Sequence, residues 1–428
     1  MKTMQKKAIL NNIKKTAQNH REPRWFILRR LEALKNFSLL SLPQLHRFSF
    51  DKWPLTVEKS LKWSEKNNKL KSDLQQNSKF NLIQVGSINF KNNLSSKLKK
   101  QGVILTDIFS AFLKYPKLME KYFMNEIINW KENKLTAYHA AFLNSGILLY
   151  IPKNISIKTP IVSQIIQDSI SRNQPFVFHI LIIADTGSQV EFSEHLTTIG
   201  KKENLASCFV EILANDNAQV KFSSFDQLGV NITSYLDRQA YVKKDAKVNW
   251  NLGTMNYGNT LGNFESYLVG DGSQSDIKTV AITSNQQKTG LNTKIVNFGR
   301  HSQGNILQRG IIQDNSTLVF NGIGHLVHGS KGSSSLQENR LLMMSENSRG
   351  DANPVLKVDE NDVSAGHSAS VGQVNKKDMY YLMSRGISRQ AAKTMIIKGF
   401  LKTVLTEISS KTVRNHLNQE IGRRLSHE

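Results

Sequence analysis

The sequence predicts a mainly β protein in which a β-helix core lies between α-helical regions at the two ends of the chain. Three observations lead to this prediction. Similar polar turns recur at nearly constant intervals in the middle of the chain, alternating apolar and polar residues follow them, and helical periodicity is confined to the two ends. A regular repeat of turn and strand is typical of stacked rungs, each of which buries its apolar side against the next.

The repeat is clearest in four turns whose matching positions, 187, 217, 245 and 272, are 30, 28 and 27 residues apart. A strand pattern follows each of them, as in Val190–Ser193 after the first turn. We assign residues 314–319 as a fifth copy. A sandwich of hairpins also has turn signals every 8–12 residues or so, but here the turn keeps its own sequence pattern, which favours the β-helix.

Helical patterns predict the two flanking regions. In the segment 22–31, Ile27, Leu28 and Leu31 form one apolar stripe. The predicted domains are an N-terminal helical region (1–125), a β-helix core (126–373) and a C-terminal helical domain (374–428).

Three helices are predicted in the C-terminal domain. The first begins at Asn375 and ends at Gly386, the second begins at Ser388, and the third extends from Val404 to Ile421. About fifty residues are too few for a large core, so this domain is expected to pack on the β-helix or on a partner.

The charge is unusual, because 57 Lys and Arg stand against 34 Asp and Glu, for a net charge of +23. Residues 1–35 carry ten Lys or Arg and two acids. Such a field attracts polyanions. No nucleic-acid-binding motif accompanies it, and we favour the interpretation that it is a solvated, lysine-rich surface.

Cysteine and apolar segments indicate the compartment. Cys208 is the only cysteine, so no intramolecular disulfide can form, which fits a reducing environment. It lies in the apolar run 208–213 and is interpreted as a small core residue. No segment has the roughly 18–20 apolar residues of a membrane helix, and the N-terminus lacks the apolar stretch of a signal peptide. We therefore expect a soluble protein of the cytoplasm.

No catalytic residues are predicted. The sequence contains no P-loop, no nucleophile elbow and no pair of acids in a setting that would identify a glycosidase. His325 and His328 form a close histidine pair, but residues three apart on a strand face opposite sides and do not share an ion. His367 lies among small residues where the β region ends, and it is either a structural histidine or an iron ligand.

Several ordered motifs resemble the SufB/SufD family of iron–sulfur cluster assembly proteins, and most closely its SufD branch of Gram-positive type. One of them is Asn361-Asp-Val-Ser-Ala-Gly-His-Ser-Ala-Ser-Val-Gly372. The others lie at 318–325, 337–345, 349–354 and 380–387, and Glu22-Pro-Arg-Trp25 with Arg29 is similar to the N-terminal start of SufD proteins.

The resemblance implies a right-handed parallel β-helix with helical domains at both ends, in a non-catalytic scaffold subunit. Such a subunit pairs with SufB through the β-helix and carries the SufC ATPase on its C-terminal helices, for which Tyr381, Met395 and Phe400 are the candidate contacts. It is expected to form a homodimer where these partners are absent, and to bind neither membrane nor nucleic acid.

On the same resemblance, His367 corresponds to the family's interface histidine, a candidate ligand of iron or of a cluster. The chain alone is expected to bind no cofactor, and an iron–sulfur cluster is held transiently and shared with SufB. Many SufD proteins have a cysteine two residues before this histidine, where this chain has Ala365. With Cys208 as the one thiol, cysteine ligation should come from SufB, because a cluster needs about four ligands.

Two other classes stay open at this point. A β-helix enzyme that acts on acidic polysaccharide would suit the positive charge, but neither a signal peptide nor a charged groove is visible in the sequence. A nucleic-acid-binding protein would lose affinity steeply with salt.

Overall fold

The computed structural model describes residues 2–57, 80–170, 175–406 and 411–426. Within these ranges the strands form two sheets. In spatial order, the ten-stranded sheet contains β19 (Val363–Gln373), β17 (Ser333–Met343), β15 (Gln303–Ile312), β13 (Gln274–Thr283), β11 (Lys247–Thr254), β9 (Gln219–Gln227), β7 (Gln189–Gly200), β5 (Ile161–Ser169), β1 (Leu82–Val85) and β2 (Ile88–Asn92). The nine-stranded sheet contains β18 (Arg349–Val358), β16 (Thr317–Leu326), β14 (Lys288–Asn297), β12 (Thr260–Leu268), β10 (Ile232–Val242), β8 (Asn204–Ala214), β6 (Phe176–Ala184), β4 (Ser145–Ile151) and β3 (Ile104–Asp107).

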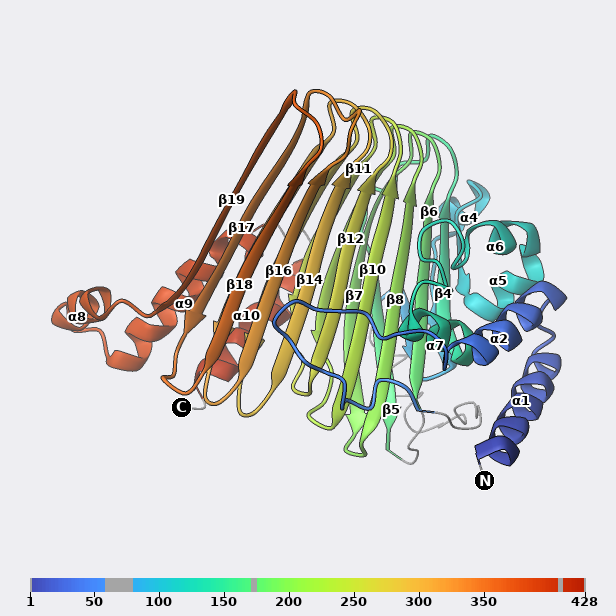
Figure 1. Ribbon diagram of the computed structural model, residues 1–428, viewed down its shortest axis with the longest axis horizontal. Helices are drawn as coiled ribbons and strands as arrows, with labels where there is room; N and C mark the ends of the chain where they lie inside the picture. Colours follow the sequence, from blue (N-terminus) through green and yellow to red (C-terminus); the bar gives the residue numbers. More distant parts are fainter. Residues whose placement is uncertain (1, 58–79, 171–174, 407–410, 427–428) are drawn as a thin grey trace.

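The chain alternates between the two sheets, so that each even-numbered strand and the odd-numbered strand after it make one turn of a flattened parallel β-helix. From β4 and β5 to β18 and β19 there are eight such turns (Figure 1). The prediction of a mainly β chain with a β-helix between helical ends is confirmed.

Helices occupy both ends of the described chain. The N-terminal ones are α1 (Lys2–Asn19), α2 (Arg24–Asn36), α4 (Ser96–Lys100), α5 (Ile108–Lys114), α6 (Pro116–Tyr122) and α7 (Lys134–Phe142). The C-terminal ones are α8 (Lys376–Ser384), α9 (Arg389–Leu405) and α10 (Lys411–Ser426). None of the helices in the described ranges is long and apolar enough to cross a membrane.

The predicted starts of the C-terminal helices are confirmed for the first two. The Asn375 side chain accepts the N–H of Lys377 at the start of α8, and Ser388 accepts the N–H of Ala391 at the start of α9. The predicted start of the third helix is wrong, because Val404 belongs to α9. Its apolar side chain continues the buried stripe of that helix, so periodicity alone did not reveal the break.

The repeated turn explains how the rungs stack. Its left-handed residue recurs in six successive turns, at Gly187, Asn217, Asp245, Gly272, His301 and Gly332. Each of these residues donates its backbone N–H to a carbonyl in the next turn, at 2.7–2.9 Å. The assignment of 314–319 as a further copy is wrong, because this turn joins β15 to β16 at the opposite edge of the β-helix. Asp314 is also left-handed, so both edges use the same turn chemistry.

The described residues form three apolar cores. The first fills the space between the two sheets and includes Phe192, Phe222 and Trp250. The second lies between the N-terminal helices and the outer face of the nine-stranded sheet, where Phe26 and Phe209 are buried. The third lies between α9, α10 and the outer face of the ten-stranded sheet. Helices α9 and α10 therefore pack on the β-helix, which is one of the two outcomes expected for this small domain.

Candidate functional site

His367 lies on β19, the outermost strand at the free end of the β-helix (Figure 1). Its partner in register on β17 is Gln337, which is buried between the sheets. Because residues in register on neighbouring strands point to the same side, His367 faces the inner side of the β-helix, and it is exposed since β19 is the last strand. Ala365 and Ala369 are the next residues on this face, and their small side chains leave the imidazole accessible.

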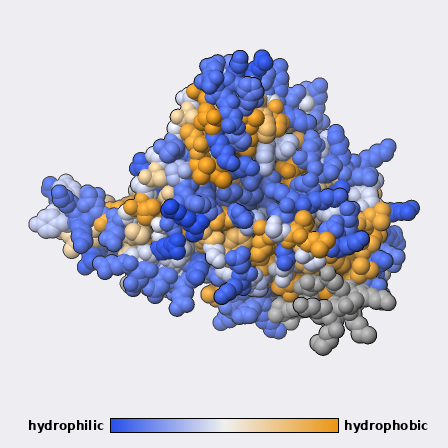
Figure 2. Space-filling view, viewed as in Figure 1, coloured by the Kyte–Doolittle hydropathy of each residue, from blue (hydrophilic) through white to orange (hydrophobic). Residues whose placement is uncertain are grey.

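The free end consists of two unpaired strand edges. Strands β18 and β19 each end their sheet, so one row of backbone N–H and C=O groups on each strand has no strand partner in the described chain. Leu336, Val358 and Val371 are exposed there, and Figure 2 shows hydrophobic residues among hydrophilic ones in the region of the last strands. Such an edge can pair with a strand from another chain.

The described residues do not form a complete metal centre. His325 Nε2 lies 2.8 Å from Asp359 Oδ2, whereas His328 Nδ1 lies 3.8 Å from Glu360 Oε2, so the two histidines have separate partners, in keeping with the sequence. No group of three or more His, Cys, Asp or Glu among the described residues is placed to hold an ion. Any ion at His367 would therefore need further ligands from solvent or from another chain.

Cys208 lies on β8 with its side chain in the interior core, as expected. Burial raises the pKa of this thiol well above its ordinary value, with Glu194 as a further cause. Because the thiolate is the form that binds metal, Cys208 is unsuited to ligation in this position.

An ionic group inside the core was not predicted. Arg238 on β10 donates to both carboxylate oxygens of Asp226, at 2.7 and 2.9 Å, and to Glu194 at 3.1 Å. Burial raises the pKa of Glu194 to about 7, although Arg238 acts in the opposite direction. All three residues occupy inward positions of their strands. They could have been found from the sequence, because the alternation of inward and outward positions along β7, β9 and β10 places all three on the inward side.

The three candidate contact residues on the C-terminal helices differ in exposure. Tyr381 on α8 is 57% exposed and Met395 on α9 is 52% exposed. Phe400 on α9 is only partly exposed, because it packs against the third core and lies 5.6 Å beneath the guanidinium of Arg309. Tyr381 and Met395 are thus available to another chain, whereas Phe400 mainly attaches α9 to the β-helix.

Helix α8 buries none of its side chains in the described chain. Beside it lies a cavity of about 440 Å³ between α8, α9 and the end of β17, lined by Met343, Met379, Tyr380 and Met383 among others. Tyr380 and Met383 are exposed and were not among the predicted contacts. The sequence feature that could have identified them is the apolar face of α8, the helix that directly follows the last strand.

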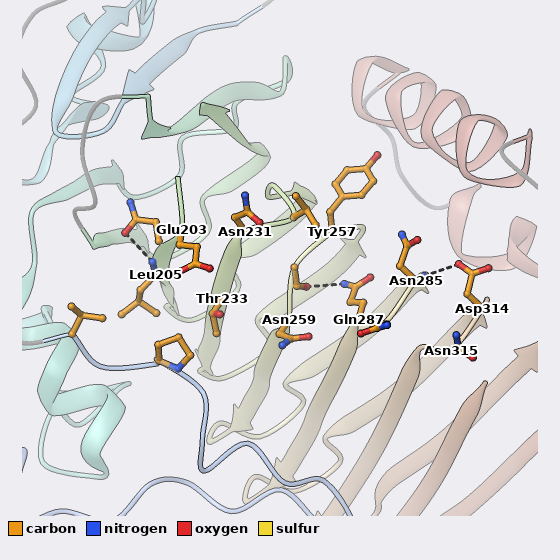
Figure 3. Close-up of a pocket in the computed structure, with 16 residues that line it drawn as sticks. Glu203, Leu205, Asn231, Thr233, Tyr257, Asn259, Asn285, Gln287, Asp314 and Asn315 are labelled. Atoms are coloured by element: carbon orange, nitrogen blue, oxygen red, sulfur yellow. Dashed lines mark hydrogen bonds between the residues drawn. The ribbon is translucent and has the colours of Figure 1, made fainter. Parts of the chain in front are cut away.

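A larger cavity, of about 810 Å³, follows the turns at one edge of the β-helix (Figure 3). Its amides hold the turns together: Gln287 Nε2 donates to the carbonyls of Asn256 and Gly258 at 2.9 Å. None of the described residues that line it is Lys or Arg, and Figure 3 places Glu203 and Asp314 at opposite ends of the row. This groove therefore suits neither an acidic polysaccharide nor paired-carboxylate catalysis.

Comparison with known proteins shows which family this chain resembles. The family model described as "SUF system FeS cluster assembly, SufBD core domain" matches residues 166–400, and "SufBD protein N-terminal region" matches residues 2–164. The "Iron-sulfur cluster assembly protein SufD" of Bacillus subtilis (strain 168) is 36% identical, over 96% of this chain and 97% of the relative. An "Iron-sulfur cluster assembly SufBD family protein" of Staphylococcus epidermidis is 26% identical, over 93% of this chain and 89% of the relative.

Proposed function

Since this chain belongs to the SufBD family of iron–sulfur cluster assembly proteins, we propose that it is the non-catalytic scaffold subunit of a SufB–SufC–SufD complex. The observation that carries the proposal is the free end of the β-helix, where two unpaired strand edges flank the exposed His367. A scaffold needs surfaces that position partners, and this end offers one.

The first partner surface is the pair of edges on β18 and β19. A SufB-like subunit would extend both sheets across this end through backbone hydrogen bonds. His367 would then lie at the junction and contribute an imidazole ligand to a transient cluster shared by the two chains. The cysteine ligands would come from SufB, because Cys208 is buried and position 365 is alanine. Without SufB, a second copy of this chain would occupy the same edges.

The second partner surface is the exposed side of α8 and α9, which would receive a SufC-like ATPase. Tyr381 and Met395 supply exposed apolar area there. Phe400 would act indirectly, since its packing fixes α9 to β13 and β15. Strand β19 ends at Gln373 and α8 begins at Lys376, so a movement imposed on α8 would be transmitted over a short connection to the strand that bears His367.

The test is co-purification of this chain with SufB-like and SufC-like subunits, comparing the original chain with His367→Ala. We expect the variant complex to assemble and to lose iron–sulfur absorbance. The matched control is His328→Ala, which removes an imidazole that is largely exposed at a nearby turn and should leave the absorbance unchanged. An intact variant complex with normal cluster content would restrict His367 to a structural role, and the absence of any complex would refute the scaffold.

A further inference from the structure

Two buried amides lie directly behind His367. Gln337 and Asn339 project inward from β17, with exposed fractions of 4% and 0%. Among the described residues, the Oε1 atom of Gln337 and both side-chain polar atoms of Asn339 have no hydrogen-bond partner. Buried amides in folded proteins are almost always paired with protein or with an ordered ligand or water. The Gln337 Nε2 donates to the carbonyl of Val355 at 3.0 Å, which leaves its Oε1 and the whole Asn339 amide unpaired. These neighbouring unpaired atoms indicate a site for something polar.

Two glycines on the facing strand leave space for these amides between the sheets. On the facing strand β16, a Cβ atom at Gly322 would lie 2.7 Å from Asn339 Nδ2 and 2.8 Å from Gln337 Oε1, and one at Gly324 would lie 2.7 Å from Gln337 Nε2. Any side chain at these two glycines would push the amides aside. The glycines thus keep both amides between the sheets.

The amides are close to the free end. In register, Gln337 pairs with His367 and Asn339 pairs with Ala369 on the last strand. Neighbouring strands are about 4.8 Å apart, so the imidazole and the Gln337 amide project to the same side one strand spacing apart. In the described part of the chain, the residue in register in front of Asn339 is Ala369, whose side chain is a single methyl group.

The unpaired atoms are mainly acceptors. Three of the four are the carbonyl oxygens of Gln337, Asn339 and Gln308, and the fourth is the donor Nδ2 of Asn339. Gln308 pairs in register with Asn339 on the next strand inward. Carbonyl oxygens repel an anion and accept hydrogen bonds from water that a cation polarises. An imidazole with oxygen ligands suits a divalent first-row metal such as iron.

We propose that Gln337 and Asn339, with His367, form an inward-facing site that receives an aquated ferrous ion. This inference rests on the proposed function, in which iron is the cargo. The imidazole nitrogen of His367 replaces one coordinated water, which leaves as water, and no electron is transferred. Water molecules that remain on the iron donate to the Gln337 carbonyl, and through a further water to Asn339.

The test is anaerobic equilibrium dialysis of the full chain against Fe²⁺, repeated with Co²⁺, whose visible absorbance reports its ligands. We expect Gln337→Leu and Asn339→Leu each to weaken binding about 10-fold or more, the effect of one hydrogen bond to a charged group. Asn353→Leu is the matched control, since Asn353 points outward and pairs with Asn321 at 3.0 Å; it should not change metal binding.

Thermal unfolding separates a binding role from a structural one. Asn339→Leu removes an unpaired buried amide at nearly constant volume, so the melting temperature should stay the same or rise while metal binding falls. If Gln337→Leu fails to fold, Gln337→Met replaces it in the dialysis. Unchanged affinity in the position 337 and 339 variants overturns the proposal, as does an original chain that binds no Fe²⁺. Complex formation with SufB-like and SufC-like subunits, measured separately, would still stand in either case.

Discussion

Replacing Glu211 tests how the N-terminal helical region is joined to the β-helix. Glu211 projects from the outer face of β8, and its side chain is fully buried. Its two oxygens accept the backbone N–H groups of Met124 at 2.8 Å and Ile128 at 2.9 Å, and Oε2 also lies 3.0 Å from Nε2 of His179. One carboxylate thus accepts two backbone N–H groups of the loop that follows α6.

The expected loss follows from these contacts. A hydrogen bond to a charged group contributes about 1.5–3 kcal/mol. In Glu211→Gln one oxygen still accepts, but the new amide N–H₂ faces a backbone N–H, so one bond is lost and the local free energy of opening falls by about 1.5–3 kcal/mol. Glu211→Leu removes both bonds and leaves two buried donors unpaired, for about 3–6 kcal/mol.

The assay is hydrogen–deuterium exchange of the peptide that contains Met124 and Ile128. Since 1.4 kcal/mol corresponds to a factor of ten, these amides should exchange about 10- to 100-fold faster in Glu211→Gln and faster still in Glu211→Leu. The control is Glu203→Gln, which changes an exposed carboxylate at an edge turn and should leave this peptide unaffected. Exchange within a factor of two of the original chain in both Glu211 variants would refute the reasoning.

Three further predictions concern pH, a turn and a partner surface. Burial raises the pKa of Glu194 from 4.5 to about 7. Between these two pH values the folded state therefore keeps a proton that the unfolded state loses. The stability that this group contributes is complete below about pH 4.5 and is lost as the pH rises through about 7. Denaturation measured across this range should show that fall, and Glu194→Gln should flatten it. Gly332→Ala should destabilise the chain more than Gly329→Ala, by about 1 kcal/mol or more, in urea unfolding: both glycines have positive φ, but only a Cβ at Gly332 meets the ring of His301, at 2.3 Å. Tyr381→Ala should leave the melting temperature unchanged, since the ring is exposed, yet weaken binding of a SufC-like subunit about 10-fold or more in calorimetry; unaltered affinity would remove Tyr381 from the interface.

The fold was predictable because its signals are local. The turns at 187, 217, 245 and 272 can be recognised in the sequence by glycine, asparagine and aspartate, the residues that tolerate positive φ. The same reasoning failed for 314–319, because turns at both edges of the β-helix use the same residues. Only the alternation of the two sheets, a long-range property, assigns a turn to one edge or the other.

The site was less predictable, because it depends on register. His367 was identified from its neighbours in sequence, but its relation to Gln337 arises from a pairing 30 residues away. Asn339 gave no signal at all, since an amide on an alternating strand is ordinary until the opposite strand proves to carry Gly322. Likewise, Tyr381 is exposed and Phe400 is partly buried because of how the helices pack on β13 and β15, and periodicity does not reveal that packing.

The composition of β19 explains how an open β-helix end can exist in a separate chain. A long unpaired strand invites uncontrolled pairing, especially if it is flat and hydrophobic. Yet seven of the eleven residues of β19 are Ser, Ala or Gly. These side chains offer little apolar area, so a random neighbour gains little from the contact. A specific partner at this edge must therefore gain its affinity from backbone hydrogen bonds along the edge and from the exposed Val371 and Leu336 beside it. Such an edge favours a partner that binds along it at several places at once, as the proposed scaffold role would require.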